Sequence, residues 1–319
     1  MNVLVFGGSG FLGGYVADEL SSQGHNVTIF DKKKYKYIKN NQKMIIGDIT
    51  NFNEIDSIVS DNDIVYHFAG IAGIKDASDN PINTVKSNIL ATTYILEACK
   101  NHKVLRFIFA SSIYVYSDLG SFYRTSKQSC ELLIENYNKI YNLNFTILRF
   151  GALYGRRAND FNFIGDAINQ ALVTKKIIRE GSGEGIRDYI HVKDAAISSA
   201  KVLSNDYKNR YIMISGNQTV KVKDILNMIN EILNNEIEII YKNPEEEDHY
   251  EMTPYTFRPR LAKKLILHEY HELGQGILDC VYDTYKSISN SKEKNKLKID
   301  LPVNIWMNLN NYNNNKTIN

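Results

Sequence analysis

A glycine-rich segment directly after the first apolar run constrains the fold most strongly. Asn2–Phe6 is almost entirely apolar, and the next residues are Gly7-Gly8-Ser9-Gly10-Phe11-Leu12-Gly13. They match G-x-G-x-x-G, and Gly7 extends the match to G-x-x-G-x-x-G. Glycines at this spacing allow a sharp strand-to-helix turn, a close approach of the backbone to a pyrophosphate, and tight packing of the helix on the sheet. The segment predicts a Rossmann-type βαβ unit that binds a dinucleotide through Gly7, Gly10, Phe11, Leu12 and Gly13.

The remaining apolar runs extend this unit into an α/β fold. Through about residue 215, short apolar runs alternate with amphipathic stretches, a pattern typical of a parallel sheet covered by helices. The expected strands are Asn2–Phe6, Asn26–Phe30, Lys43–Ile46, Ile64–Phe68, Arg106–Ala110 and Asn144–Arg149. The expected helices are Phe11–Gln23, Asn53–Val59, Pro81–Asn101 and Tyr123–Tyr141. Because the apolar runs are continuous, we expect strands buried on both faces, in a doubly wound parallel sheet.

After Gly151 the pattern changes, which predicts a smaller second lobe. Helices are expected over Asp160–Thr174 and Val222–Leu233, and a loop, a strand and a turn over residues 181–194. The expected domains are a dinucleotide-binding Rossmann domain at 1–150 that includes parts of roughly 185–215, a mainly substrate-binding lobe at 151–290, and a partly flexible C-terminal extension at 291–319.

Charge and cysteine content exclude several classes of function. The 319 residues include 38 basic and 36 acidic side chains, a net charge of +2, which gives no electrostatic footprint for nucleic acid. Cys99, Cys130 and Cys280 have no metal-ligand spacing and are typical of reduced, packed thiols, so we predict no metal site. No stretch reaches the ~18 uninterrupted apolar residues of a membrane helix. The apolar N-terminus lacks the basic start of a signal peptide, so we expect a soluble, cytoplasmic protein.

Asp31 indicates which dinucleotide binds. It ends the second expected strand, roughly 20 residues beyond the glycines, where a carboxylate accepts hydrogen bonds from the adenosine ribose hydroxyls and repels a 2′-phosphate. Lys32, Lys33 and Lys34 follow it and could instead hold the 2′-phosphate of NADP. We expect NAD, with the lysines in a solvated turn.

Tyr123 and Lys127 indicate the chemistry. They lie four residues apart at the start of an expected helix, which places both side chains on one face. A free tyrosine has a pKa of about 10 and is a poor base at neutral pH, but a nearby ammonium and the positive ring of an oxidised nicotinamide favour the phenolate. Ser111 and Ser112 follow the strand Arg106–Ala110 at its carboxyl end, where open α/β sheets bind ligands. A hydroxyl there could orient a substrate alcohol toward Tyr123.

Together these features resemble the extended short-chain dehydrogenase/reductase family, in its NAD-dependent sugar-nucleotide epimerase/dehydratase branch. The resemblance covers roughly residues 1–290 and includes the segments GDI at Gly47–Ile49, VYHFAG at Val65–Gly70, SSIYVY at Ser111–Tyr116, YRTSK at Tyr123–Lys127 and RDYIHVKD at Arg187–Asp194.

The resemblance implies roles for individual residues. Ser112 is the catalytic hydroxyl, Tyr123 the catalytic base, and Lys127 the partner that binds the cofactor ribose. The implied substrate contacts are Ser112, Tyr114, Arg187, which would bind the diphosphate, and Arg258 as a second arginine. Besides the glycine turn, Asp31, Tyr123 and Lys127, the implied cofactor contacts are Asp48, Ile49, Phe68, Ala69, Gly70 and Asn88.

The resemblance also implies a reaction: oxidation of a sugar carbon, usually C4, by bound NAD. We expect a nucleotide-diphosphate sugar as substrate and either 4-epimerisation or net formation of a 4-keto sugar, in surface-polysaccharide precursor synthesis, and we favour a GDP-linked heptose. The alternatives are a UDP-hexose 4-epimerase, an NADPH-dependent 4-keto-sugar reductase and, from another class, a non-catalytic dinucleotide-binding sensor.

Departures from the family pattern narrow this reaction. Family 4,6-dehydratases carry acidic groups directly after the catalytic hydroxyl, because elimination needs an extra acid and base. Here Ile113 and Tyr114 occupy those positions, so we do not expect dehydration. The short segment Ser117–Phe122 and Ala152, which stands where relatives often have asparagine, predict either a more open sugar site or drift around an ordinary hexose site.

The family's mode of pairing implies a homodimer or homotetramer. Its members associate through the helices that here contain Asn88 and Tyr123. Cys130, Leu133, Ile134 and Tyr137 form an apolar helix face that either serves this contact or covers the sheet.

Overall fold

The computed structural model describes residues 1–158, 162–242, 262–291 and 294–301. The chain divides into two compact units. The first comprises Met1–Leu153, Asp188–Thr219 and Glu246–Tyr270, and the second comprises Tyr154–Arg187, Val220–Glu245 and His271–Asn319.

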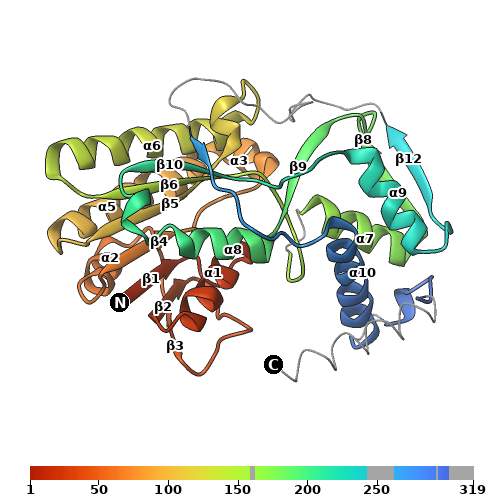
Figure 1. Cartoon of the computed structure of the whole chain (residues 1–319), viewed down its shortest axis with the longest axis horizontal. Helices are drawn as coiled ribbons and strands as arrows, with labels where there is room; N and C mark the ends of the chain where they lie inside the picture. The colour runs from red at the N-terminus through yellow and green to blue at the C-terminus, as the bar shows by residue number, and fades with distance from the viewer. Residues whose placement is uncertain (159–161, 243–261, 292–293, 302–319) are drawn as a thin grey trace. The chain divides into compact units, whose positions relative to one another are not determined.

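A parallel sheet forms the centre of the first unit (Figure 1). Within the described residues it has eight strands in the order β13-β10-β6-β5-β4-β1-β2-β3. Their bounds are β1 (Asn2–Phe6), β2 (Asn26–Asp31), β3 (Gln42–Ile46), β4 (Ile64–His67), β5 (Arg106–Ser112), β6 (Phe145–Phe150), β10 (Arg210–Ile214) and β13 (Lys263–Lys264). Every neighbouring pair is parallel. The α/β fold and the six expected strands are confirmed, and β10 and β13 add to them.

The helices of the first unit connect these strands. They are α1 (Phe11–Ser22), α2 (Phe52–Val59), α3 (Ile74–Asp79), α4 (Pro81–Thr84), α5 (Ala91–Asn101), α6 (Ser121–Tyr141) and α8 (Val192–Lys201), with a π-helix η1 (Val85–Leu90) and 3-10 helices η2 (Ile113–Tyr116) and η3 (Asn205–Tyr207).

The expected helix Pro81–Asn101 is confirmed, and it contains the π-helical segment η1. One expectation about the helices is wrong. The expected turn before Asp194 is the first turn of α8, because His191 Nδ1 accepts the backbone N–H of Lys193 at 3.3 Å and caps the helix.

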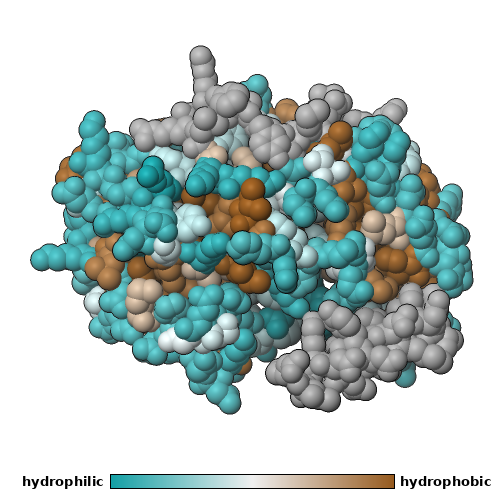
Figure 2. Space-filling view, viewed as in Figure 1, coloured by the Kyte–Doolittle hydropathy of each residue, from teal (hydrophilic) through white to brown (hydrophobic). Residues whose placement is uncertain are grey.

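Alternation along β1 creates two apolar layers. Val3 and Val5 belong to a core cluster with residues of α1 and α8, whereas Leu4 and Phe6 belong to a cluster with residues of α2, α5 and α6. Successive side chains of a strand point to opposite faces, so helices cover both sides of the sheet (Figure 1). In the view of Figure 2, hydrophilic residues cover most of this unit, and hydrophobic ones show in small groups between them.

The second unit is smaller. It contains α7 (Phe163–Thr174), α9 (Val222–Ile232), α10 (Leu273–Ser289) and the 3-10 helix η4 (Lys294–Lys296), and the parallel strand pair β8 (Lys176–Glu180) and β12 (Glu238–Lys242). The strands β11 (Thr219–Lys221), β9 (Ile186–His191) and β7 (Ala152–Tyr154) form a further three-stranded sheet in this order. The two helices expected here are present as α7 and α9, and α10 was not expected.

Within the described ranges, no helix is both long enough and apolar enough to cross a membrane. The same ranges contain no group of three or more His, Cys, Asp or Glu residues that could hold a metal ion.

Substitution of Gly13 by alanine tests the close packing of α1 on the glycine turn. A Cβ at Gly13 would lie 2.3 Å from the Gly7 carbonyl oxygen, which is backbone and cannot turn aside. We expect Gly13→Ala to lower the free energy of unfolding by about 2 kcal/mol, measured by urea denaturation. Gly165→Ala in α7, where the nearest atom is 3.6 Å away, is the control, and equal stability of the two variants would contradict the packing argument.

Candidate active site

The glycine turn connects β1 to α1 and packs against the segment that follows β4. Gly7 has φ +79°, and a Cβ there would lie 2.4 Å from the backbone nitrogen of Ala69. Gly10 is the N-cap of α1 and offers no side-chain cap to its first N–H groups. A Cβ at Gly10 would meet only the Gly7 carbonyl oxygen, at 3.1 Å. Uncapped N–H donors at a glycine turn that bears no Cβ at Gly10 fit a bound pyrophosphate.

Asp31 lies beside this turn at the end of β2. Its two carboxylate oxygens accept the backbone N–H groups of Ser9 and Lys33, each at 3.0 Å. A carboxylate has about four acceptor positions, so both oxygens can still accept ribose hydroxyls. Lys32, the first lysine after Asp31, forms an exposed ion pair with Asp48 at 3.2 Å. Burial opposes ionisation of Asp48, but hydrogen bonds from Thr50 and the pairing with Lys32 lower its pKa.

Asn88 ties the loop after β4 to α6. Its side-chain oxygen accepts the N–H of Ile71 at 2.7 Å, and its amide nitrogen donates to Ile71 O at 3.0 Å and to Ser126 Oγ at 2.9 Å. Gly70, with φ +141°, leaves room for this amide, since a Cβ there would lie 2.7 Å from Asn88 Oδ1. The Asn88 side chain therefore fixes the loop that contains Phe68 and Ala69 and is called the Asn88 clamp below. Ile49, which follows β3, is buried.

Ser112 and Tyr123 come together at the end of β5. Ser112 Oγ accepts the N–H of Tyr114 at 3.2 Å and caps η2. The Ser112 side chain lies beside Tyr123. Burial raises the pKa of Tyr123, and the Ser112 hydroxyl works in the opposite direction by stabilising the phenolate.

Lys127 follows one turn later on α6. Its Nζ donates to the carbonyl of Ala110 at 2.8 Å and lies 5.8 Å from the centre of the Tyr123 ring. Burial lowers the pKa of Lys127, while Cys130 and Glu131 raise it. Burial, with a contribution from Lys127, also lowers the pKa of His67 to about 3, so that imidazole is neutral. The fold thus brings Ser112, Tyr123 and Lys127 to one place.

Tyr114 packs edge-on against the Tyr123 ring. The Tyr114 and Tyr123 ring centres are 6.2 Å apart with planes at 78°. Gly120, with φ +99°, is required beside them, because a Cβ there would lie 2.7 Å from Tyr114 Cδ1. The Arg124 guanidinium donates to Ser117 O at 2.8 Å and holds the short turn before α6.

Two arginines, Arg187 and Arg258, are predicted substrate contacts. Arg187 belongs to the second unit, where it is buried in β9 and its guanidinium donates to Ile186 O at 2.9 Å. Its contact with a diphosphate stays a prediction. Arg258 lies outside the described residues.

Glu131 and Arg149 were not singled out from the sequence. They form a buried ion pair of 2.6 Å behind Ser112. One signal was available: Tyr123, Lys127 and Glu131 repeat at a spacing of four, which places a carboxylate on the same helix face as the other two.

Comparison with known families identifies the chain. Residues 3–214 match the model of the NAD dependent epimerase/dehydratase family. The chain belongs to this family. It is therefore an enzyme of an NAD-dependent family, as the resemblance implied, and the glycine turn and Asp31 provide a site that fits its cofactor.

Individual members of the NAD dependent epimerase/dehydratase family differ in their reactions. A putative UDP-glucose 4-epimerase of Methanocaldococcus jannaschii is 27% identical over 270 residues, which are 78% of this chain and 88% of the relative. A UDP-N-acetyl-alpha-D-glucosaminuronate decarboxylase of Bacillus cytotoxicus is 28% identical over 264 residues, 75% of this chain and 82% of the relative.

A solved structure of this family shows the same fold. UDP-glucuronic acid 4-epimerase from Bacillus cereus, in complex with UDP-glucuronic acid and NAD, superposes with a TM-score of 0.79 at 22% identity, over 90% of this chain and 100% of that chain.

Substitution of Asp31 tests the cofactor preference. We expect Asp31→Asn to weaken NAD binding about tenfold, because the charged acceptor for ribose hydroxyls is lost, and to reduce the discrimination against NADP. Isothermal titration with both cofactors measures this. Asp63→Asn is the matched control, since the Asp63 carboxylate also accepts a backbone N–H, that of Asn2 at 2.8 Å, at the opposite end of β1. Unchanged NAD affinity in Asp31→Asn would contradict the assignment.

Proposed function

We propose that this enzyme oxidises a nucleotide-diphosphate sugar at C4 by means of NAD, with Tyr123 as the base. The observation that carries the proposal is that Ser112 lies beside Tyr123, with Lys127 one helical turn away and its Nζ 5.8 Å from the centre of the Tyr123 ring. The pair lies at the carboxyl edge of the sheet that also holds the glycine turn and Asp31.

Each residue of the pair has a distinct task in this proposal. Bound NAD supplies the hydride acceptor. Tyr123 takes the proton of the sugar hydroxyl, and Ser112 orients that hydroxyl toward the phenolate. Burial makes the phenolate costly, and the ammonium of Lys127 and the hydroxyl of Ser112 favour it.

The residues around Ser112 favour epimerisation or net oxidation over dehydration. Ile113 is buried and apolar, and Tyr114 packs on the Tyr123 ring, so neither position supplies the carboxyl group that an elimination needs. The two relatives described above act on UDP-sugars by name, which supports a sugar nucleotide as substrate. Within that class we favour a GDP-linked heptose, with a UDP-hexose as the alternative, and a role in capsule or other surface-polysaccharide precursor synthesis.

A substrate panel tests the proposed reaction. The NAD-bound enzyme is incubated with UDP-, GDP- and dTDP-linked hexoses and with GDP-heptose, and products are identified by NMR. We expect a 4-epimer or a 4-keto sugar from one nucleotide class. Absence of any reaction across the panel contradicts the proposal, and a preference for NADPH with 4-keto sugars would identify a reductase instead.

Removal of the Tyr123 hydroxyl tests the assignment of the base. We expect Tyr123→Phe to reduce kcat about a thousandfold while NAD still binds, because only proton transfer is lost. Tyr137→Phe on the same helix removes a phenol that donates to Glu97 at 2.8 Å and is the matched control. Full turnover in Tyr123→Phe would refute its role as base.

We also propose that the enzyme works in the cytoplasm, where its free, buried cysteines stay reduced.

We further propose that the enzyme is a homo-oligomer that pairs through α6 and the helical segment that contains Asn88. Cys130 and Ile134 are buried in the core and Leu133 and Tyr137 pack against it, so this helix face covers the sheet. The opposite face is exposed: on α6 it presents Phe122, Leu132 and Ile140, and on α4 and η1 it presents Ile82 and Val85. Adjacent exposed apolar faces favour association.

A charge on this exposed face tests the oligomer. We expect Leu132→Glu to convert the assembly to monomers, measured by analytical ultracentrifugation, because a buried carboxylate without a partner opposes association. Leu105→Glu is the control, since Leu105 is 59% and Leu132 56% exposed but Leu105 lies directly before β5 and is not part of α6. An unchanged assembly in Leu132→Glu would rule out pairing through α6.

A further inference from the structure

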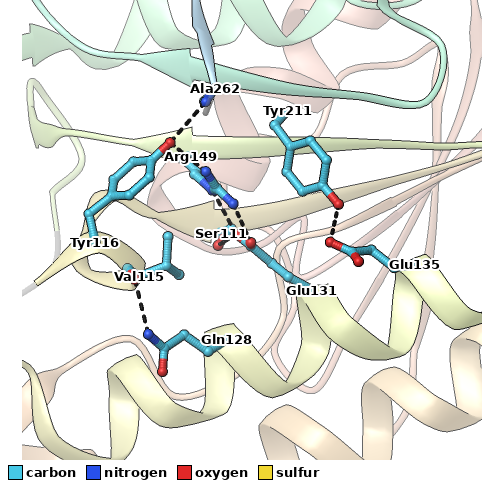
Figure 3. Close-up of polar contacts among 9 residues, drawn as sticks. All are labelled: Ser111, Val115, Tyr116, Gln128, Glu131, Glu135, Arg149, Tyr211 and Ala262. Carbon is cyan, nitrogen blue, oxygen red and sulfur yellow. Dashed lines mark hydrogen bonds and ion pairs between the residues drawn. The ribbon is translucent and has the colours of Figure 1, made fainter. Parts of the chain in front are cut away.

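A buried ion pair lies behind the Ser112–Tyr123 pair. Glu131 of α6 is 2% exposed and Arg149 of β6 is fully buried. Arg149 Nε donates to Glu131 Oε1 at 3.0 Å, and Nη2 donates to Oε2 at 2.6 Å, so the contact is bidentate (Figure 3). Burial alone would lower the pKa of Arg149, but the Glu131 carboxylate outweighs burial and raises it. The Arg149 guanidinium is therefore held in its charged form by this contact.

This pair holds the chain on both sides of Ser112. On the preceding side, Ser111 Oγ donates to Glu131 Oε1 at 2.6 Å. On the following side, Arg149 Nη1 donates to the phenol oxygen of Tyr116, which also accepts the N–H of Ala262 at 3.0 Å. Figure 3 shows Ser111 at the Glu131 carboxylate and Tyr116 at the Arg149 guanidinium.

Helix α6 adds a second contact to the same segment. Gln128 Nε2 donates to the carbonyl of Val115 at 3.0 Å (Figure 3). Gln128 and Glu131 therefore connect α6 to η2 and to the end of β5, the two elements between which Ser112 lies. We call Ser111, Tyr116, Gln128, Glu131 and Arg149 the Ser112 frame.

The frame and the base share one helix face. Tyr123, Lys127 and Glu131 are spaced by four residues, and a helix rises about 1.5 Å per residue. The Glu131 contacts therefore set the axial position and rotation of the helix two turns from Tyr123. Around the Tyr123 ring lie Lys127 from its own helix, Ser112 from β5 and Tyr114 from η2.

We propose that Glu131 and Arg149 are positioning residues that, through Ser111 and Tyr116, hold the Ser112 hydroxyl at hydrogen-bonding distance from Tyr123. The proposal rests on the proposed function in so far as Tyr123 is the base. The Glu131–Arg149 ion pair would then support catalysis indirectly, by positioning Ser112, in addition to stabilising the packing of α6 on the sheet.

The test breaks the frame at its outer contacts, because removal of Glu131 or Arg149 would leave the other charge buried without a partner and destabilise the fold. Ser111→Ala removes the hydroxyl donor before Ser112, and Tyr116→Phe removes the phenol oxygen after it. Tyr211→Phe is the matched control: its phenol donates to Glu135 one turn further along α6, and its ring, which packs on Arg149 at 4.9 Å, is retained.

Two readouts are measured on the NAD-bound enzyme. The first is steady-state kinetics with the substrate found in the panel. The second is the pKa of Tyr123, from ¹³C NMR of tyrosines labelled at Cζ, with the Tyr123 signal assigned by its loss in Tyr123→Phe. The Ser112 hydroxyl lowers the pKa of Tyr123, so a displaced Ser112 raises it and moves the acid limb of the pH–rate profile to higher pH.

We expect Ser111→Ala and Tyr116→Phe to lower kcat about tenfold with KM nearly unchanged, and to raise the pKa of Tyr123 by about half a pH unit. Tyr211→Phe should do neither, even where its thermal stability falls equally. If all three variants behave alike, the positioning role is wrong.

If the wild-type enzyme converts no sugar nucleotide, the proposed function fails and the NMR titration alone decides the positioning role. A raised pKa in the two frame variants then supports that role, and an unchanged pKa overturns it.

Discussion

Parallel pairing of the central strands is the constraint on which the site depends. Phe6 at the end of β1 pairs with Phe30 of β2 and His67 of β4, and Ser112 at the end of β5 pairs with Phe150 of β6. Because all these strands run the same way, the segments after them emerge at one edge of the sheet. The glycine turn, Asp31, the loop after β4 and Ser112 are therefore neighbours, although the chain between them is long.

Burial destabilises charged side chains at this edge of the sheet, and the structure compensates for this differently at each residue. His67 is neutral, as its lowered pKa shows. Lys127 has a backbone carbonyl as acceptor, and Glu131 and Arg149 neutralise each other through two hydrogen bonds. An unpaired buried charge would be strongly destabilising. Tyr123 differs from these groups, because burial disfavours its anion. Its proposed role as base therefore depends on the neighbours that favour the anion.

The fold leaves the reaction open, and the residues around Ser112 narrow it. Relatives of this chain include a putative UDP-glucose 4-epimerase and a UDP-N-acetyl-alpha-D-glucosaminuronate decarboxylase, so membership of the family does not fix the reaction. In this chain Ile113 and Tyr114 follow the hydroxyl, and Gly120 accommodates the Tyr114 ring. Neither position carries the carboxyl group that a dehydration needs, and this supports the proposed oxidation or epimerisation.

Local patterns in the sequence predict several features of the structure, because each depends on residues close together in the chain. These are the glycine turn, the position of Asp31 at the end of a strand, the six expected strands, and the placing of Tyr123 and Lys127 on one helix. The places of β10 and β13 in the sheet, the Asn88 clamp and the Glu131–Arg149 pair came only from the folded chain. Arg149 ends an apolar run that reads as an ordinary strand, and Glu131 reads as an ordinary helix residue. Their pairing depends on β6 lying beside β5 under α6, a long-range contact that no local spacing encodes.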